Sequence, residues 1–196
     1  MNDIILYGRI RDIEYSHDIC GIEYNKAKLI CERPGKEDDV ISLKFKKFSN
    51  RYKEGDLVEL KGNIRSYSQR LGDKNKVDIY VFTYFDIPDA TLVNSVKLDG
   101  RICKLDRLRY SKTGKEYIHF ILANNIYVGR DKKINNYIPC VCYGESALMV
   151  NELKINDVVN LNGQLHSHTY RKEENNEIIF KVAHEVNVSD IELIKE

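Results

Sequence analysis

The sequence of this 196-residue chain lacks several features that mark familiar protein classes. It contains no tryptophan and no run close to the roughly 20 apolar residues that a membrane span requires. Its first residues lack the basic and apolar regions of a signal peptide. Neither a Gly-rich phosphate loop nor the signature of a catalytic triad occurs. We therefore expect a cytoplasmic protein with no membrane contact, no cofactor and no enzymatic activity.

An excess of charge of one sign is also missing. The 31 lysines and arginines nearly balance the 30 aspartates and glutamates, so the formal net charge is +1. Nothing in the overall charge indicates a polyanionic partner, and any nucleic-acid site must be a local patch. The hydrophobic fraction of 42% and the charged fraction of 31% are those of an ordinary globular protein with a packed core.

Cysteine is scarce and its spacing is uninformative for metal binding. The five cysteines, at positions 20, 31, 103, 140 and 142, include no CxxC pair, which argues against a disulfide framework and a zinc ribbon. Cys140 and Cys142 could form half of a metal site, but strand alternation places both inside the core, where cysteine behaves as a small hydrophobic residue. We expect reduced thiols and no metal.

What the chain does contain is an internal repeat with a period of about 100 residues, the signature of a duplicated domain. LYGRI at residues 6–10 returns as LDGRI at residues 98–102, and the segment 55–64 matches 156–165. In both copies a serine and then an arginine follow the second match. We predict a first domain at 1–89, a short linker at 90–94 and a second domain at 95–196, with the two domains packed together.

Within each repeat the apolar residues alternate, as strands require, and do not recur at helical spacing. Gly8, Gly62, Gly100 and Gly163 interrupt strand patterns, which indicates sharp bends or bulges that help a small sheet to close into a barrel. The pattern predicts five strands per repeat. One short helix is expected at 145–153, whereas the matching segment 48–53 carries a weaker signal.

The second repeat resembles the bacterial single-stranded DNA-binding protein (SSB) family. The resemblance is carried, in order along almost the whole repeat, by Asn94, Val96, Leu98, Gly100, Arg101 and Ile102, then by residues 108–111 with Gly114, Phe120, Leu122 and Ala123, residues 138–144, 156–159 and 163–165, and Tyr170 with Arg171. The first repeat carries a diluted version. The resemblance implies an all-β chain of two tandem, five-stranded OB-fold barrels, with a short helix in at least the second.

The family resemblance also implies a function without catalysis, in which the protein coats and protects single-stranded DNA with little regard to sequence. Such a binder needs a basic groove along which aromatic rings stack on successive bases. The thirteen tyrosines suit positions with one face buried and one exposed to water. In the family, aromatic residues occupy positions that match Tyr137, Tyr143 and Tyr170.

Strand parity tests this assignment in the second repeat. If Ile138, Cys140 and Cys142 point into the barrel, Tyr137, Val141 and Tyr143 point outward together. By the same rule, Leu165, Ser167 and Thr169 would face inward, leaving His166, His168 and Tyr170 outside beside Arg171.

In the first repeat, parity places charge where the second repeat has rings. Ile41, Leu43 and Phe45 point inward, and Lys44 and Lys46 point outward. A shift by one residue would align Phe45 with Tyr143 but would bury Lys44, so we prefer the first register. In the next strand of this repeat, Ile64, Ser66 and Ser68 are expected inside, and Arg65 and Tyr67 outside.

The predicted site thus has two sets of residues. The candidate stacking residues are Tyr67, Tyr127, Tyr137, Tyr143 and Tyr170, and the candidate phosphate contacts are Lys44, Lys46, Arg65, Arg70, Arg101, Arg109, His168 and Arg171. The alternatives are that the tyrosines fill the barrels or cover the contact between the repeats, and that the cations are plain solvated surface. Tyr24 and Tyr117 are expected to be structural, and no partner group makes the two histidines a metal pair or a general base.

The family works with four OB domains, so two per chain predict a homodimer, with a pseudo-dimeric monomer as the alternative. Residues 190–196 follow the last strand directly, without the flexible, acidic-tipped tail common in the family, so we expect no partners recruited through such a tail. A specialised role on a mobile element or in a replication or primosome-type assembly fits this lack. An OB-fold scaffold for protein partners and an RNA-binding protein remain the rival hypotheses. We expect stacking to concentrate in the second repeat.

Overall fold

A computed structural model describes residues 1–47, 52–71, 74–86, 94–128, 132–174 and 177–194. The strands of the first repeat are β1 (Asn2–Ile19), β2 (Ile22–Cys31), β3 (Asp39–Lys46), β4 (Leu57–Leu71) and β5 (Lys74–Asp86). The elements of the second are β6 (Ser95–Leu105), β7 (Arg109–Tyr110), β8 (Glu116–Val128), β9 (Lys132–Tyr143), α1 (Glu145–Asn151), β10 (Val158–Glu174) and β11 (Glu177–Leu193). Among these residues, no helix is long and apolar enough to span a membrane.

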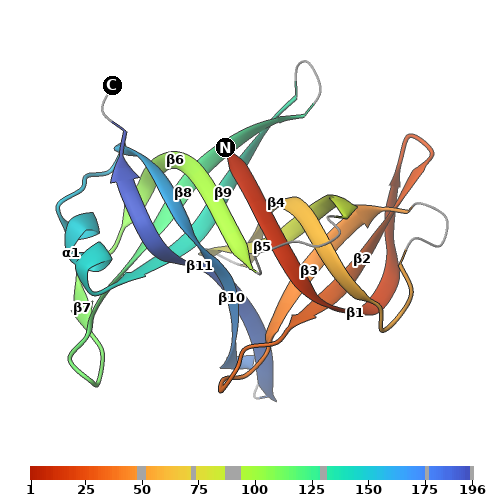
Figure 1. The fold of residues 1–196 in the computed structure, drawn as a ribbon, viewed down its shortest axis with the longest axis horizontal. Coiled ribbons are helices and arrows are strands. Elements are labelled where there is room, and N and C mark those ends of the chain that lie inside the picture. Colours follow the sequence, from red (N-terminus) through yellow and green to blue (C-terminus); the bar gives the residue numbers. More distant parts are fainter. Residues whose placement is uncertain (48–51, 72–73, 87–93, 129–131, 175–176, 195–196) are drawn as a thin grey trace.

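The strands close into two barrels of the same topology (Figure 1). The first has the order β2-β3-β5-β4-β1 and closes through β1–β2, and the second has the order β8-β9-β11-β10-β6 and closes through β6–β8. In each barrel the third and fifth principal strands pair in parallel, and the other pairs are antiparallel. The predicted all-β fold of two tandem OB-fold barrels is confirmed. The division at 1–89, 90–94 and 95–196 stays a prediction, because residues 87–93 lie outside the described residues.

Alternation explains the barrel interiors. Ile41, Leu43 and Phe45 of β3 are buried, as are Ile138, Cys140 and Cys142 at the matching places in β9. The cysteines are free thiols within the hydrophobic core, as their alternation predicts. The preferred register of the first repeat is also confirmed: Tyr24 pairs with Lys46, just as Tyr117 pairs with Tyr143, so Lys46 and not Phe45 takes the position of Tyr143.

The four glycines inside strand patterns mark places where two backbones almost touch. A Cβ atom at Gly100 would lie 2.6 Å from the carbonyl oxygen of Ala123, and one at Gly163 would lie 2.4 Å from that of Asn187. Gly8 and Gly62 occupy the equivalent places in the first barrel, with a carbonyl oxygen 2.5 Å from each Cβ position. A register shift directly precedes Gly62 and Gly163, so the predicted bulges are present there.

Helix α1 closes one end of the second barrel. It follows Gly144, which has a φ of 59°, and it turns Ala147 and Val150 into the core. The predicted helix at 145–153 is therefore present, ending two residues early. Its counterpart at 48–53 lies mostly outside the described residues.

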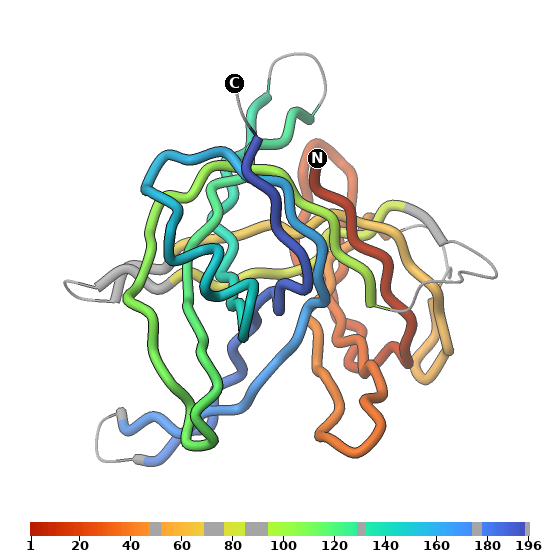
Figure 2. Tube along the Cα trace, turned by 60° about the vertical axis from the view of Figure 1, so that its left-hand side comes forward, coloured from red at the N-terminus to blue at the C-terminus, as the bar shows by residue number. Residues whose placement is uncertain are grey.

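The two barrels join through an antiparallel contact between β1 and β6, which pairs Ile4 with Val96 (Figure 2). Asn2 and Asn94 have equivalent roles beside this contact. Asn2 exchanges two hydrogen bonds of 2.8 Å with the backbone of Ile64, and Asn94 exchanges two of 2.7 and 2.8 Å with the backbone of Leu165. The joint thus repeats the same local structure in each barrel.

Two sequence predictions fail at this joint. Ser66 and Ser167 do not face the interior of their own barrels but contact the other barrel, where each hydroxyl oxygen accepts a backbone N–H, from Tyr137 and Val40 respectively. Ser68 and Thr169, also predicted inside, are exposed. The reason is that β4 and β10 run beyond the closed barrels into long hairpins, so alternation continues where no interior remains.

Candidate nucleic-acid interface

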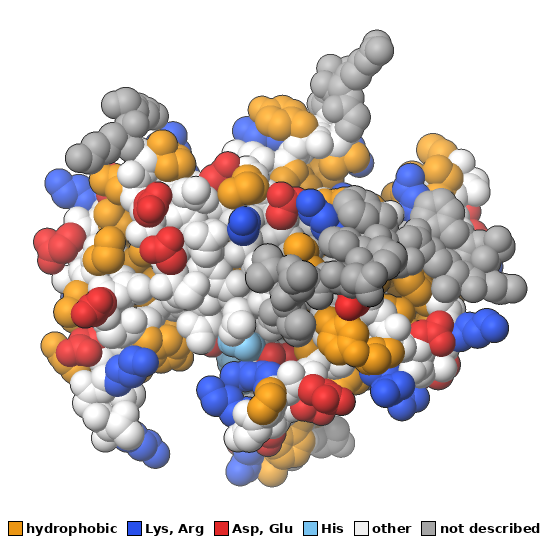
Figure 3. All heavy atoms as spheres, viewed as in Figure 1, with side chains coloured by type: hydrophobic (Ala, Val, Ile, Leu, Met, Phe, Trp, Pro, Cys, Tyr) orange, Lys and Arg blue, Asp and Glu red, His pale blue; other side chains and the backbone are white. Residues whose placement is uncertain are grey.

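Each barrel presents one broad outer surface made by four neighbouring strands. We call the outward residues of β2, β3, β5 and β4 the first face, and those of β8, β9, β11 and β10 the second face. The two faces contain equivalent positions because the barrels share their strand pairing. Basic and acidic side chains are interspersed on the side of the molecule shown in Figure 3, in keeping with the near-neutral net charge.

The second face carries a pair of tyrosines. Tyr143 of β9 is 38% exposed, and its ring centroid lies 6.2 Å from that of Tyr117 of β8. The ammonium group of Lys115 lies 5.5 Å from the centre of the Tyr143 ring, which is within range of a cation–π contact. Burial, with the charges of Glu185 and Tyr117, raises the pKa of Tyr143, so its ring stays neutral and offers a stacking surface.

A groove of about 430 Å³ runs along this face and over the joint between the barrels. Its second-barrel wall includes Tyr143, His166, His168 and Glu185, and the first barrel adds Arg33 and Lys36 from the loop between β2 and β3. Nucleic acid on the second face would therefore meet cations of both repeats, which the sequence could not reveal.

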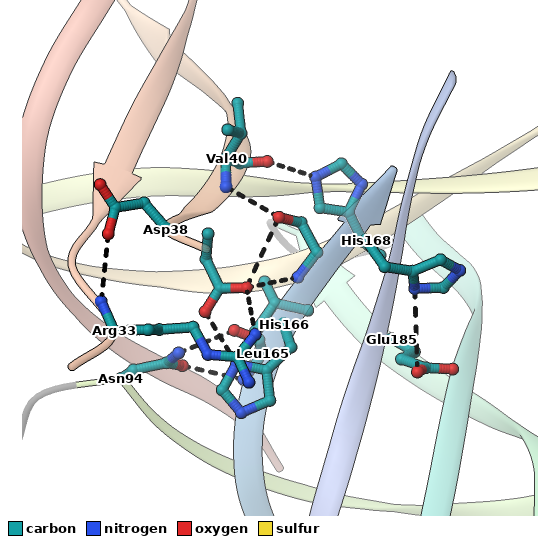
Figure 4. A network of polar contacts seen from close by, with 11 residues as sticks. Arg33, Asp38, Val40, Asn94, Leu165, His166, His168 and Glu185 are labelled. Carbon is teal, nitrogen blue, oxygen red and sulfur yellow. Dashed lines mark hydrogen bonds and ion pairs between the residues drawn. The ribbon is translucent and has the colours of Figure 1, made fainter. Parts of the chain in front are cut away.

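The buried carboxylate of Asp39 fixes that loop in place through the polar network in which Figure 4 labels Arg33 and His166. Asp39 has an exposed fraction of 0% and accepts the backbone N–H of Ser167 at 2.7 Å. It also contacts Nδ1 of His166 at 2.8 Å and the guanidinium of Arg33 at 3.3 Å. Because a buried charge is costly unless it is paired, these contacts tie Arg33 and His166 to one another across the joint.

The first face carries more rings than its sequence indicated. The ammonium group of Lys44 lies between Tyr80, 4.4 Å from the ring centre, and Tyr67, 5.7 Å from it. The guanidinium of Arg65 lies 3.8 Å from the centre of the Phe82 ring. These residues line or adjoin a groove of about 550 Å³.

The same column extends to β2 and β1. Tyr24 lies 6.2 Å from Phe82 between ring centroids and stacks on His17 at 4.9 Å with an interplanar angle of 3°. The sequence reading missed Tyr80, Phe82 and the outward position of Tyr24. The signal was available, since the inward Ile79 and Val81 require Tyr80 and Phe82 to point outward.

Burial affects the charge of two cations of the first face. Burial, and then the charge of Lys26, lower the pKa of Lys44. Burial also lowers the pKa of Arg65, although a hydrogen bond and the charge of Tyr80 act in the opposite direction. Both groups have thus lost part of their hydration, which reduces the cost of transferring them to a phosphate.

A known protein family matches the part of the chain that carries the second face. The family model described as "Single-strand binding protein family" matches residues 93–194, more than half of the chain. The chain belongs to the single-strand binding protein family. Members of this family are binding proteins, which confirms the expectation that the chain is not an enzyme. No curated protein sequence matches it significantly.

Solved structures of the family share the architecture of the whole chain. The single-stranded DNA binding protein from Thermus aquaticus matches in its wild-type form, with a TM-score of 0.73 and 15% identity, over 100% of this chain and 94% of that one. A deletion mutant of the same protein matches with a TM-score of 0.74 and 16% identity, over 100% and 95% of the two chains. At these identities the likeness establishes a shared fold.

The other predicted stacking residues of the second repeat, Tyr170, Tyr127 and Tyr137, lie in three different surroundings. Tyr170 lies on the β10–β11 hairpin with its ring 6.3 Å from that of His168. Tyr127, near the tip of the β8–β9 hairpin, is 72% exposed. Tyr137 is exposed at the joint, where its backbone N–H donates to Ser66. The structure therefore brings Tyr143 and Tyr170 to the second face and separates Tyr127 from it.

The predicted phosphate contacts also lie in different parts of the structure. Arg101 is directed away from the two grooves, since its guanidinium donates to the carbonyl oxygen of Asn156 at 2.6 Å and steadies the turn before β10. Lys46 is half-buried on the first face, and Arg109 and Arg171 are exposed on β7 and on the β10–β11 hairpin. The Arg70 side chain lies outside the described residues.

Metal binding gains no support from the geometry. Among the described residues, no group of three or more histidine, cysteine, aspartate or glutamate side chains could hold a metal ion. Burial raises the pKa of Cys142 to about 12 and that of Cys140 well above its usual value, so both stay protonated core residues.

Proposed function

We propose that this chain binds single-stranded DNA along both barrels, with little sequence preference and without catalysis. The observation that carries the proposal is that the two equivalent faces each combine aromatic rings with cations, as Lys44 between Tyr67 and Tyr80 shows on the first and Lys115 over Tyr143 on the second. Family membership and the shared fold support the same function.

The two faces contribute in complementary ways. The first places its rings on β5, with Tyr80 and Phe82, where the second has Glu185 and Asn187. The second places a ring, Tyr143, on β9, at the position that Lys46 occupies in the first barrel. Each stacked base contributes about 1–3 kcal/mol, and the phosphate contacts make the affinity fall steeply with salt. Stacking is thus divided between the repeats and not concentrated in the second.

We further propose that two chains associate, which gives an assembly of four barrels. Support comes from the joint within one chain, which already pairs two barrels through β1 and β6 with equivalent contacts on either side. Light scattering coupled to size-exclusion chromatography should give twice the 22.9 kDa mass of one chain. A mass of one chain would favour the pseudo-dimeric monomer.

Fluorescence anisotropy with labelled oligo-dT, oligo-U and duplex DNA tests the binding proposal. Oligo-dT should bind at low salt and more weakly at moderate salt, and duplex DNA should bind far more weakly. Absence of oligo-dT binding even at low salt would overturn the proposal, and stronger binding of oligo-U would identify an RNA-binding protein instead.

Two pairs of substitutions locate the site. Tyr143→Ala with Tyr170→Ala removes rings from the second face, and Tyr80→Ala with Phe82→Ala removes them from the first. Each pair should weaken oligo-dT binding by about tenfold or more, since each stacked base is worth about 1–3 kcal/mol. Tyr15→Ala is the control, because this exposed tyrosine of the β1–β2 hairpin lies outside both faces. Unchanged affinity in both pairs would refute the stacking assignment.

A further inference from the structure

Three of the chain's five histidines gather on the second face around two carboxylates. Glu185 of β11 lies 3.5 Å from Nε2 of His119 on β8 and 3.9 Å from Nδ1 of His168 on β10. His166 contacts Asp39 across the joint. The side chains of His119 and His168 are 41% and 54% exposed, so a ligand on this face can reach both, and His168 also lines the groove.

The first face has permanent cations at two of the three equivalent positions. The pairing of Tyr24 with Lys46 and of Tyr117 with Tyr143 makes Lys26 the counterpart of His119, two residues further along each strand. The bulges at Gly62 and Gly163 make Arg65 the counterpart of His166 and Tyr67 that of His168. Two of the duplicated positions therefore hold lysine and arginine in one barrel, whereas all three hold histidine, the residue type used in proteins as a pH switch, in the other.

The carboxylate of Glu185, which lies beside His119 and His168, adds to this difference between the two faces. Burial raises the pKa of Glu185, but the hydrogen bond and charge of His119, followed by the charges of His168 and His166, outweigh it and hold the pKa below its usual value. Glu185 is thus ionised throughout the range in which imidazole titrates. With neutral histidines this anion repels a phosphate, and with protonated histidines the same corner of the groove becomes cationic.

The second face therefore differs from the first in how it meets a phosphate. We propose that His119 and His168, above Glu185, form a proton-dependent site for the phosphodiester backbone, whereas the first barrel holds the backbone with permanent cations. This inference rests on the proposed binding of single-stranded DNA. Binding a phosphate stabilises the imidazolium form, so the second barrel takes up protons when the strand binds, and its affinity falls as the pH rises.

The other charged and titratable groups around this site determine the part of the DNA affinity that does not depend on His119 and His168. Lys115, Arg33 and Lys36 line the same groove and remain charged, and they hold a residual affinity at high pH. Behind the site, burial lowers the pKa of His184, which favours the neutral form of that ring. Tyr117 lies beside His119 and next to Tyr143, and Lys104 and Asp106 line a pocket together with His119. The ring of Tyr170 lies beside His168.

Oligo-dT binding measured between pH 5.5 and pH 8 tests the proposal. The affinity of the native protein should increase by about tenfold toward pH 5.5. The plot of log affinity against log salt concentration should become steeper by about 1.4, because each added cation contributes about 0.7 for single strands. Far-ultraviolet circular dichroism at each pH checks that the barrels remain folded.

Substitution separates this site from a general effect of acid. The double variant His119→Gln with His168→Gln should bind as the native protein does at pH 8 and show no increase at pH 5.5. His17→Gln is the matched control for the pH dependence alone, because it removes a histidine that lies away from the second face. Its affinity should still increase toward pH 5.5 as that of the native protein does, whatever the loss of its ring from Tyr24 does to the affinity at pH 8. His166 is left in place since it anchors Asp39.

The outcomes distinguish the inference from the function on which it rests. Equal affinity of the native protein at both pH values, or the same pH dependence in the double variant, would overturn the proton-dependent site while leaving DNA binding intact. Loss of the pH dependence in His17→Gln would also overturn it. Absence of binding at every pH would reject the proposed function itself.

Discussion

Ser66 and Ser167, which occupy the same position in the two repeats, make the same contact in opposite directions across the joint. Each hydroxyl oxygen accepts a backbone N–H from the other barrel at 2.8 Å, from Tyr137 and from Val40. The residue before each donor completes the contact: Asn136 accepts the N–H of Ser66 at 3.1 Å, and Asp39 accepts that of Ser167 at 2.7 Å. The contacts to the backbone are thus equivalent on the two sides of the joint, but the acceptor is charged only on the side of Asp39.

This asymmetry predicts unequal costs of substitution. Asp39→Ala leaves the Ser167 N–H, His166 and Arg33 without their common acceptor, and it should reduce the free energy of unfolding by about 3–5 kcal/mol. Asp39→Asn introduces the residue type that Asn136 provides on the other side of the joint. It keeps one acceptor oxygen and should therefore reduce the free energy of unfolding by less. Asn136→Ala should cost about 1–3 kcal/mol. Urea denaturation at neutral pH measures all three, and a cost near zero for Asp39→Asn would contradict the charged network.

The close approach of backbones at glycine predicts sensitivity to one added carbon. Gly100→Ala places a Cβ atom 2.6 Å from a carbonyl oxygen, so the strands must separate, at a cost of about 1–3 kcal/mol or more. Gly114→Ala is the comparison, because nothing lies within 4 Å of its Cβ position and only its positive φ of 79° is unfavourable, by about 1–2 kcal/mol. Thermal unfolding should therefore show the lower midpoint for Gly100→Ala.

Lys44 provides a test of the first face. Lys44→Gln removes the cation between Tyr67 and Tyr80, so the dependence of oligo-dT affinity on salt should weaken by about 0.7 in logarithmic slope. Lys97→Gln, on the exposed side of β6 and outside both faces, should leave the slope unchanged. If both variants retained the native slope, the first face would not contact phosphates.

The five thiols should fall into two classes. Cys20 and Cys103 are exposed and should react with an aromatic disulfide reagent in the native protein, whereas Cys31, Cys140 and Cys142 should react only after unfolding. Burial raises the pKa of Cys103, so Cys20 should react first, and a Cys20→Ser variant should show only the slower native phase. Rapid reaction of more than two thiols would contradict the packed interior of the barrels.

His184 predicts a loss of stability in mild acid. Burial lowers its pKa, even though its Nε2 lies 2.8 Å from the carbonyl oxygen of Val40. Because the native state favours the neutral ring, this contribution is complete above the usual histidine pKa of about 6.5 and is lost as the pH falls below it, with a slope of at most about 1.4 kcal/mol per pH unit. Unfolding of His184→Gln should lack this part of the pH dependence between pH 7 and pH 5.

The sequence was most informative where a rule is local. Alternation placed Ile138, Cys140 and Cys142 inside and Tyr143 outside, because side-chain direction in a strand depends only on the pleat. The same rule was wrong for Ser68 and Thr169, since it cannot tell where a strand leaves its barrel. Val141 points outward as predicted and yet is 1% exposed, because neighbouring groups of the groove cover it.

By itself, the sequence determined the duplication, the strands and the outward tyrosines of the second repeat, all of which follow from periodicity along the chain, and its motifs carried the resemblance to the family. Only the tertiary structure decided which outward side chains meet. Asp39 and His166 lie 127 residues apart, and their contact exists because the β1–β6 joint brings the β2–β3 loop of one barrel over the face of the other. Such a contact depends on how two closed barrels pack together, and no local pattern records that.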